Sequence, residues 1–274
     1  MNNKFSIVIA IKGYSKNLSK TLESINKQIY LPNEVIIVSN DRILQTFNLN
    51  KKITLKKYTS KIKNQVFQRN IAIKNISKKS NLILQLDERV FLNKNCLYYL
   101  NNLWKNSDQS VIGVGINQIN RFESRGLLNM VIQNFNLKGK VLTNGMNIDY
   151  SNVKKDIEVM WLKGGLSSWR IKKNKKIKDY KYPLWKWSIF EDVEFCLKKN
   201  SKDKLLVSHK AKAKIIDRNK KLSTDDLIYR GSIHTFSQKR LVKKYFKNMT
   251  FFFLNYPFFN FFKSNYVNFD IKFF

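Results

Sequence analysis

Two adjacent acidic residues stand at the end of an apolar run in the first third of the chain. The run at residues 81–87 ends in Asp87, and Glu88 follows it. Neighbouring carboxylates repel one another unless a cation or an arginine neutralises them. Their hard oxygen atoms suit Mg²⁺ or Mn²⁺ bridging a diphosphate. The pair therefore predicts a metal or diphosphate site, although an acidic pair after a strand is also common as an ordinary surface feature.

A second acidic pair, Glu191 and Asp192, begins a predicted short helix at residues 190–199, with Glu194 in the same turn. Acids at a helix start often do no more than complement the helix dipole. Aromatic residues crowd the segment just before this helix, however. If they wall off one of the carboxyl groups, its pKa rises toward neutrality, as a general base requires.

Two further motifs could contribute to a binding site. Gly164 and Gly165 end an apolar stretch and would let a ligand or another strand approach the backbone closely, although a plain turn is the alternative. Arg69 lies in the predicted opening of a helix. It could reach a phosphate or a base at the sheet edge, or simply lie on a solvated helix face.

Alternating strands and helices must position these residues. Continuous apolar runs predict buried strands at 5–11, 34–38 and 81–87, and amphipathic spacing predicts helices from Leu18 to before Pro32 and at 64–77. Further elements are predicted at 52–58 (strand), 94–105 (helix) and 110–116 (strand), after which the pattern becomes irregular. This order predicts an α/β fold with a mostly parallel central sheet and helices on both faces, and a ligand site beyond the carboxyl ends of the strands.

Composition limits the class of protein. The 274 residues are 43% hydrophobic and 14% aromatic, which excludes a disordered or fibrous chain. The formal net charge of +33 favours polyanionic partners, but the lysines are scattered over the whole chain, so part of the charge can be a compositional habit. Two cysteines and two histidines do not suffice for a disulfide framework or a Cys/His zinc site.

The C-terminal segment differs from the rest in composition. Basic residues at 241–247 precede Met249–Phe262, which is packed with aromatic rings. That stretch is shorter than the roughly 20 residues needed to cross a bilayer, so we expect it to lie in the membrane interface. The alternative is that the rings cap the domain core or a dimer contact. We expect a catalytic domain at 1–240 and a membrane-associating segment at 241–274.

The order of these segments resembles the inverting glycosyltransferases of family 2, which have the nucleotide-sugar-binding GT-A fold. Residues 6–38 match the opening of that family nearly without gaps. The family motifs that follow in the right order are Arg-x-Asn at Arg69-Asn70, the metal motif Asp-x-Asp at Leu86–Arg89, the acceptor-side loop at Gly164–Arg170 and the Glu-Asp base motif at Glu191-Asp192. The resemblance covers roughly residues 5–220.

The resemblance implies direct displacement of a nucleoside diphosphate by an acceptor hydroxyl, with Asp192 as general base and Glu191 orienting it or the acceptor. Mn²⁺ or Mg²⁺ held by Asp87 and Glu88 would offset the charge of the departing diphosphate. The expected nucleotide-sugar-binding residues are Lys12, Ser39, Arg69 and Asp87, and the expected acceptor-binding residues are Gly164, Gly165, Trp185 and Trp187. The two acidic pairs are expected to face one common hollow.

This chain also departs from the family pattern. Ser39-Asn40 stands where the family often has two acids, Lys12-Gly13 where it usually has Tyr-Asn, and Arg89 at the second Asp of the metal motif. A cationic Arg89 beside Asp87 would weaken the binding of a divalent ion. We therefore expect reduced metal dependence, or Glu88 supplying the missing oxygen.

The expected function is transfer of a sugar from a nucleotide-sugar donor to a hydroxyl acceptor in the synthesis of lipid-linked or surface polysaccharide. The expected location is the cytoplasm, on the inner face of the cytoplasmic membrane, with an anionic membrane surface as partner. One alternative is a catalytically silent scaffold of the same fold. Another is a basic nucleic-acid-binding protein, but no recognisable reading motif supports it, and we expect no nucleic-acid partner.

Overall fold

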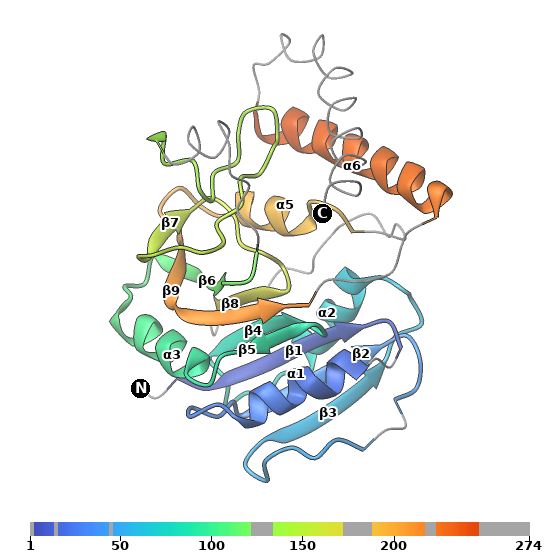
Figure 1. Cartoon of the computed structure of the whole chain (residues 1–274), viewed down its shortest axis with the longest axis vertical. Helices are drawn as coiled ribbons and strands as arrows, with labels where there is room; N and C mark the ends of the chain where they lie inside the picture. The colour runs from blue at the N-terminus through green and yellow to red at the C-terminus, as the bar shows by residue number, and fades with distance from the viewer. Residues whose placement is uncertain are drawn as a thin grey trace.

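A nine-stranded sheet forms the centre of the molecule, and helices pack against it (Figure 1). The computed structural model describes residues 3–13, 16–43, 46–121, 134–171, 188–216 and 223–246. The order of the strands across the sheet is β3-β2-β1-β4-β8-β6-β9-β5, and β7 pairs with β9. The predicted α/β fold class is confirmed.

The first half of the chain builds a parallel sheet with crossover helices. Its elements are β1 (Phe5–Ile11), α1 (Lys16–Asn26), β2 (Glu34–Ser39), β3 (Thr54–Thr59), α2 (Gln65–Lys74) and β4 (Leu82–Asp87). β1 lies between β2 and β4 and runs parallel to both. Because parallel strands end at the same edge, Ile11, Ser39 and Asp87 all reach one side of the sheet.

The second half adds strands of more varied length, and most of their pairings are antiparallel. Its elements are β5 (Val90–Leu92), α3 (Cys96–Asn106), β6 (Val111–Gln118), β7 (Ile157–Val159), β8 (Leu166–Arg170), α5 (Glu191–Leu197), β9 (Lys204–Ile215) and α6 (Thr224–Tyr245). β8 enters the middle of the sheet antiparallel to both β4 and β6. The sheet is therefore mixed, and within the mostly parallel sheet that we expected, parallel pairing is found at β1–β4 and between β6 and β9.

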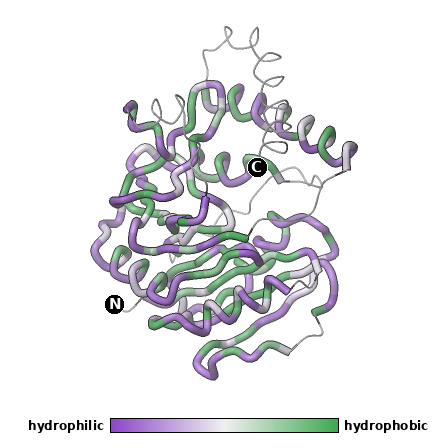
Figure 2. The backbone as a smooth tube through the Cα atoms, in the orientation of Figure 1, coloured by the Kyte–Doolittle hydropathy of each residue, from purple (hydrophilic) through white to green (hydrophobic). Residues whose placement is uncertain are grey.

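Side chains that alternate along β1 separate two apolar layers. Ile7 and Ile9 face α1 and α3, where they join Leu18 and Leu97 in one buried cluster. Val8 points to the opposite face, where it packs in the cluster that contains Ala72 of α2. Figure 2 shows these central strands as the most continuous apolar part of the backbone. Both faces of the sheet are thus buried, which explains the unbroken apolar runs in the sequence.

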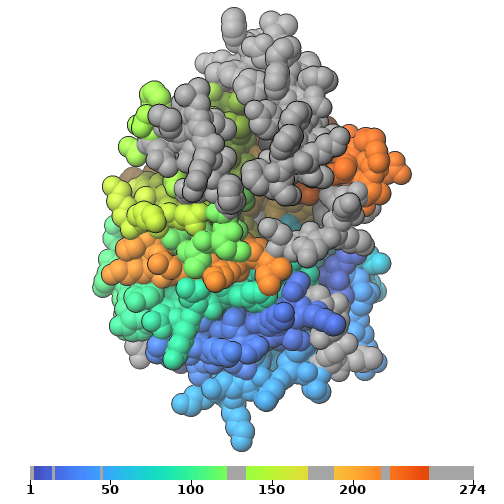
Figure 3. All heavy atoms as spheres, viewed as in Figure 1, coloured from blue at the N-terminus to red at the C-terminus, as the bar shows by residue number. Residues whose placement is uncertain are grey.

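A separate apolar cluster holds α5 and α6 over the later strands. It includes Trp169 of β8, Val207 of β9, Val193 of α5 and Leu241 of α6. Trp169 lies beside Ile83 in the β4–β8 register, so α5 covers the same face of the sheet as α2. Figures 1 and 3 show α6, in orange-red, toward the end of the molecule opposite the blue N-terminal elements.

The predicted elements up to residue 118 are confirmed to within a few residues at each end. Two later features differ from what the sequence pattern predicts. Residues 166–170, expected in an acceptor-side loop, form β8 in the sheet. A 22-residue helix, α6, begins at Thr224, where the sequence pattern was irregular. The expected division of the chain after residue 240 stays a prediction. Trp185, Trp187 and Met249–Phe262 lie outside the described residues.

Candidate active site

The end of β4 places Asp87 at the carboxyl edge of the sheet. The Asp87 amide donates to the carbonyl oxygen of Gly165 at 3.0 Å, which joins the strand to the segment before β8. The side chain of Asp87 is 40% exposed. The Glu88 carbonyl oxygen accepts a hydrogen bond from the Thr21 hydroxyl of α1 at 2.7 Å. These contacts fix the backbone of the acidic pair while the Asp87 carboxylate remains accessible.

Arg69 of α2 joins the two acidic regions. Its Nη2 lies 3.2 Å from Oδ1 of Asp87, and its Nη1 lies 3.3 Å from Oε1 of Glu191. The guanidinium is 3% exposed, and its fork geometry matches two separate carboxylates. The structure therefore brings Asp87 and Glu191 to the same cation, although they are far apart in the sequence.

Local sequence explains why α2 can present Arg69 there. The Asn64 side chain caps the helix by accepting from the amides of Val66 and Phe67 at 2.9 and 3.2 Å. Gln68 Nε2 donates to the carbonyl oxygen of Ile11 at 2.8 Å, which ties α2 to the end of β1. The helix begins at Gln65, so Arg69 lies in its second turn. The sequence had suggested instead that Arg69 lies at the opening of the helix.

The first turn of α5 presents Glu191 and Asp192 to this cluster. Glu191 Oε1 also accepts from Gln65 Nε2 at 2.6 Å. Asp192 Oδ2 accepts from the Gly164 amide at 3.1 Å, and its Oδ1 accepts from the Val193 amide at 2.8 Å. These amides fix the orientation of the Asp192 carboxylate beside the Gly164-Gly165 segment.

Burial changes the acidity of both residues of this pair. Loss of hydration, and then repulsion by Asp192, raises the pKa of Glu191 to about 8, although Arg69 opposes this shift. Burial likewise raises the pKa of Asp192, and the Gly164 and Val193 amides oppose it by stabilising the ionised form. A carboxyl pair with raised pKa values can hold or release a proton near neutral pH, which is the property that general base chemistry needs.

Gly164 and Gly165 lie directly against these side chains. A Cβ atom on Gly165 would stand 2.2 Å from Cγ of Asp87, and one on Gly164 would stand 2.9 Å from Nη1 of Arg69 and 3.2 Å from Cβ of Asp192. The distances of 2.2 and 2.9 Å are shorter than real Cβ contacts, so a side chain at either glycine would force a neighbouring group to move. The glycines therefore allow the backbone to approach the site's own charged groups, and a plain surface turn does not account for them.

Ser39 and Lys12 lie at the same sheet edge, at the ends of the neighbouring strands. The buried Ser39 Oγ accepts from the amides of Gly13 and Asp41, each at 3.2 Å, which joins the loops after β1 and β2. Gly13 has φ of +70°, a conformation that favours glycine. Lys12 is exposed at the end of β1. Their roles toward a donor stay predictions, as does the role of Trp185 and Trp187 toward an acceptor.

The position of Arg89 corrects one expectation. Its Nη1 donates to the carbonyl oxygen of Ile216 at 2.8 Å, and the Ile216 amide donates back to the carbonyl oxygen of Arg89 at 3.1 Å. Arg89 therefore ties the start of β5 to the end of β9. The guanidinium that neutralises Asp87 belongs to Arg69, so the adjacency of Arg89 in the sequence is misleading. The contribution of Gln65 was also missed, although its i, i+4 spacing to Arg69 places both on one helix face.

The residues around Asp87 fit a cation shared with a ligand better than a cation held by protein alone. Over the described ranges, no group of three or more His, Cys, Asp or Glu side chains could hold a metal ion. Mg²⁺, however, is commonly bound by one or two carboxylates together with substrate phosphates. The accessible Asp87 carboxylate and the adjacent Glu88 are of this chemical type.

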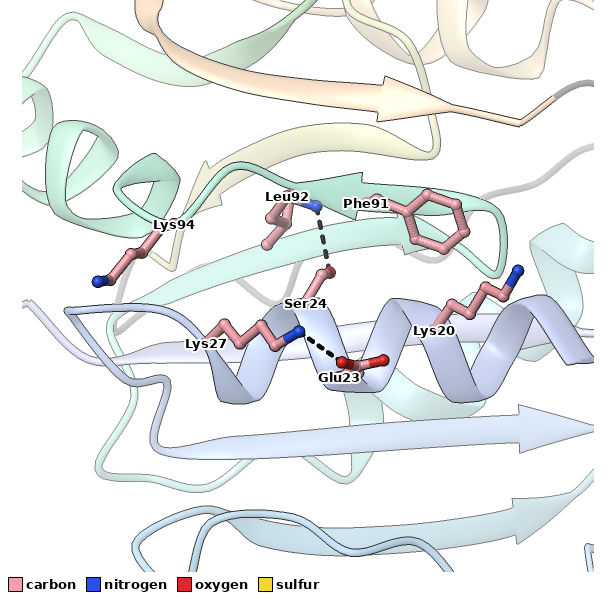
Figure 4. A pocket seen from close by; sticks show the side chains of 7 residues that line it. All are labelled: Lys20, Glu23, Ser24, Lys27, Phe91, Leu92 and Lys94. Atoms are coloured by element: carbon pink, nitrogen blue, oxygen red, sulfur yellow. Dashed lines mark hydrogen bonds and ion pairs between the residues drawn. The ribbon is translucent and has the colours of Figure 1, made fainter.

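A groove in the structure lies apart from the candidate site residues. The groove, of about 540 Å³, lies between α1 and β5 (Figure 4). Its lining consists of Lys20, Glu23, Ser24, Lys27, Phe91, Leu92 and Lys94. Lys27 is paired with Glu23, and Ser24 Oγ accepts from the Leu92 amide at 3.1 Å. None of the candidate site residues lines this groove.

Comparison with known proteins identifies the fold. No protein-family model matches the chain, and no curated protein matches it in sequence. Among solved structures, S. aureus TarS in complex with UDP-GlcNAc aligns with a TM-score of 0.51 and 16% identity, over 85% of this chain and 66% of that chain. GalNAc-T7 with UDP, GalNAc and Mn²⁺ aligns with a TM-score of 0.53 and 14% identity, over 79% of this chain and 44% of that chain.

A second TarS structure aligns with a TM-score of 0.50 and 17% identity, and this chain spans 39% of it. The chain thus spans less than two thirds of each of these proteins. TarS and GalNAc-T7 are glycosyltransferases with the GT-A fold. The GT-A fold expected from the sequence motifs is therefore confirmed.

Proposed function

We propose that this chain, which has the GT-A glycosyltransferase fold, is an inverting glycosyltransferase that moves a sugar from a nucleotide-sugar donor to a hydroxyl acceptor. The observation that carries the proposal is the cluster in which Arg69 contacts both Asp87 and Glu191 while Asp192 lies beside the Gly164 amide. This cluster stands beyond the carboxyl end of β4, where open α/β sheets bind ligands. The UDP-GlcNAc bound to TarS and the UDP and GalNAc bound to GalNAc-T7 support a nucleotide-sugar donor.

In this proposal Asp192 is the general base. Its carboxylate takes the proton of the acceptor hydroxyl as the oxygen attacks the anomeric carbon, and the bond from that carbon to the donor diphosphate breaks on the opposite side. The anomeric configuration is therefore inverted. The Gly164 and Val193 amides hold the Asp192 carboxylate in orientation. Glu191, fixed by Arg69 and Gln65, positions the base or the acceptor.

Arg69 and Asp87 are proposed to help neutralise the negative charge that develops on the departing diphosphate. The departing nucleoside diphosphate gains negative charge, and the buried Arg69 guanidinium is a fixed positive group close to it. Lys12 and Ser39, at the ends of β1 and β2, are proposed to contact the donor. A divalent cation such as Mn²⁺ or Mg²⁺, held by Asp87 and Glu88 together with the diphosphate, would supply further charge neutralisation. The Mn²⁺ in the GalNAc-T7 structure supports this assignment.

We assign acceptor binding to the Gly164-Gly165 segment and to Trp185 and Trp187, because sugar C–H faces stack well on aromatic rings. The acceptor class that we propose is a glycan or lipid-linked chain in polysaccharide synthesis. A scaffold of the same fold without activity is the second candidate. It is favoured by one specific observation, which is that Ser39-Asn40 stands after β2 where the resembled family often has two acids.

We also propose that the basic, aromatic segment at 241–274 associates with the inner face of the cytoplasmic membrane. Support comes from α6, where Ile228 and Phe236 are 63% and 56% exposed and share one helix face with the exposed Lys239 and Lys243. A helix with apolar and basic residues on its outer face suits an anionic lipid surface. No helix among the described residues has the length and apolar character needed to cross a bilayer.

Titration calorimetry with a panel of nucleotide sugars, with and without Mn²⁺, tests the proposed function together with a transfer assay. We expect at least one nucleotide sugar to bind and to be consumed. Binding without transfer to any glycan acceptor would favour the inactive scaffold, and binding of none would refute the proposed transferase. For the membrane proposal, a chain truncated after Lys247 should partition with anionic vesicles more weakly than the full chain, and equal partitioning would contradict it.

A further inference from the structure

The helix that carries the proposed catalytic pair is held from the other side by α6. α5 has only seven residues, and helices of this length have little stability of their own. Tertiary contacts must therefore fix the position of α5. Figure 1 shows α6 lying next to α5, on the side of it away from the sheet. Two contacts join these helices.

Glu194 makes the first of these contacts. Its side chain is 6% exposed and accepts a hydrogen bond from Nζ of Lys244 at 2.9 Å. Arg240 Nη2 donates to Oε2 of Glu194, and Lys198 Nζ lies 3.7 Å from Oε1, the oxygen that Lys244 contacts. Arg240 and Lys244 are one turn apart on α6, so they form a two-point attachment for one buried carboxylate. Charge-assisted hydrogen bonds of this kind are directional as well as strong.

Phe190 makes the second contact. It immediately precedes Glu191 and has φ of +65°, which is an unfavourable conformation for a residue with a large side chain. Its buried ring packs edge-to-face against the imidazole of His234 on α6, with ring centroids 4.8 Å apart. Phe190 and Glu194 are four residues apart, and the Glu194 amide donates to the carbonyl oxygen of Phe190. Both therefore face α6, whereas Glu191 and Asp192 face Arg69 and Gly164.

α6 has its own attachment to the body of the protein. Its residues Ile233, Leu241 and Val242 are buried. Gln238 Nε2 donates to the carbonyl oxygen of Asn144 at 2.8 Å, in the segment between β6 and β7. Val193 and Cys196 of α5 are also buried, so the short helix keeps an apolar contact with the body of the protein that does not depend on Glu194. Loss of the Glu194 charge is therefore expected to loosen the alignment of α5 without unfolding the domain.

We propose that Glu194 is a positioning residue, through which Arg240 and Lys244 of α6 hold the first turn of α5 so that Asp192 and Glu191 stay aligned with Gly164 and Arg69. The proposal rests on the proposed function, because alignment matters only if this pair takes part in transfer. In this proposal α6 affects the rate of transfer through the position of α5 and not through contact with a substrate. A small displacement of a catalytic carboxylate is enough to lower kcat strongly.

Kinetics of the Glu194→Gln variant of the full chain test the proposal. We expect kcat for sugar transfer to fall at least tenfold, while KM for the nucleotide sugar stays within about threefold, because the donor groups on β4 and α2 are untouched. The matched control is Glu23→Gln, which removes an exposed carboxylate that also pairs with a lysine four residues away, on α1. This control should leave both constants unchanged. An unchanged kcat in Glu194→Gln would overturn the proposal.

Charge reversal separates positioning from general stability. Glu194→Lys should lose more activity than Glu194→Gln. Adding Lys244→Glu to Glu194→Lys restores the ion pair between positions 194 and 244 with the charges exchanged. The double variant should therefore recover at least half of the lost kcat on a logarithmic scale. Failure of this recovery, with kcat, KM and melting temperature all changed together, would show a merely structural role and refute the proposal.

Hydrogen exchange distinguishes failure of this proposal from failure of the proposed function. In Glu194→Gln, the amides of residues 191–197 should exchange at least tenfold faster, while those of α2 stay protected. This result would support the α6 attachment even if the wild-type chain transferred no sugar, in which case the proposed function alone would have failed. Unchanged exchange in α5 would refute the attachment whatever the activity.

Discussion

The two acidic regions that meet at Arg69 differ in burial although they share one guanidinium. The Asp87 side chain is 40% exposed at the end of a strand, whereas that of Glu191 is 6% exposed on a helix. Burial raises the pKa of Glu191 to about 8. An accessible carboxylate can take up ligands from solvent, and a buried pair can exchange a proton near neutral pH. Under the proposed function, this difference leads us to expect donor binding at the Asp87 region and proton transfer at the Glu191-Asp192 region.

The largest expected effect comes from changing one acid in each region. Asp192→Asn should lower kcat by about 10²- to 10⁴-fold with the donor Kd almost unchanged, because only the proton acceptor is lost. Asp87→Asn should weaken donor binding by about ten- to 100-fold, the loss expected when one charged contact is removed. Steady-state kinetics and calorimetry measure the two quantities. If both variants lose affinity and kcat in the same proportion, the division of labour between the regions is wrong.

A smaller effect is expected from Gly165→Ala, which tests how closely the two regions are packed. The new Cβ atom would stand 2.2 Å from Cγ of Asp87, so the backbone or the carboxylate must move. Overpacking of this kind costs about 1–3 kcal/mol, and kcat/KM should fall at least tenfold.

The control for this variant is Gly231→Ala on α6, where a Cβ atom meets nothing within 4 Å. Replacing glycine by alanine within a helix should stabilise the fold by about 0.5–1 kcal/mol. Thermal unfolding and the transfer assay measure both variants. Equal activity in the two would show that the close approach at Gly165 is unimportant.

The smallest effect concerns pH. The base must be ionised, so kcat/KM should rise with pH through the apparent pKa of the Glu191-Asp192 pair, above the ordinary carboxyl range. Glu191→Gln removes the group whose pKa is raised to about 8 and leaves Asp192 to titrate alone, so this limb should move to lower pH. Because the folded protein keeps a proton on Glu191 that the unfolded chain releases above its ordinary pKa of 4.5, the free energy of unfolding should fall between about pH 4.5 and 8. An acidic limb near pH 4 would contradict this assignment.

The first half of the fold could be predicted because its periodicity is strong. β1, β2 and β4 are buried on both faces and read as unbroken apolar runs, and α1 has a clear apolar stripe. The second half could not be read in the same way. β5 and β7 have three residues each, too few to show a period. α6 carries Ile228 and Phe236 on its exposed face, which obscures the one-sided pattern of an amphipathic helix.

The candidate site could be predicted as a set of residues but not as a set of contacts. The types and order of Arg69, Asp87, Gly164, Gly165 and Glu191-Asp192 are visible in the chain. Which residues contact one another is not visible in the chain. The sequence does not show whether Asp87 is neutralised by its neighbour Arg89 or by the more distant Arg69. The structure turns Arg89 toward Ile216 and leaves Asp87 to Arg69.

The sequence by itself determined the alternation of strands and helices, and hence the sheet edge at which Asp87 and Ser39 emerge, because side-chain periodicity is a local property. Tertiary structure alone decided that β8 inserts antiparallel beside β4 and that α5 packs over it. That packing brings Gly165 against Asp87 and Glu191 against Arg69. Long-range packing also buries Glu191, and burial is what raises the pKa of its carboxyl group.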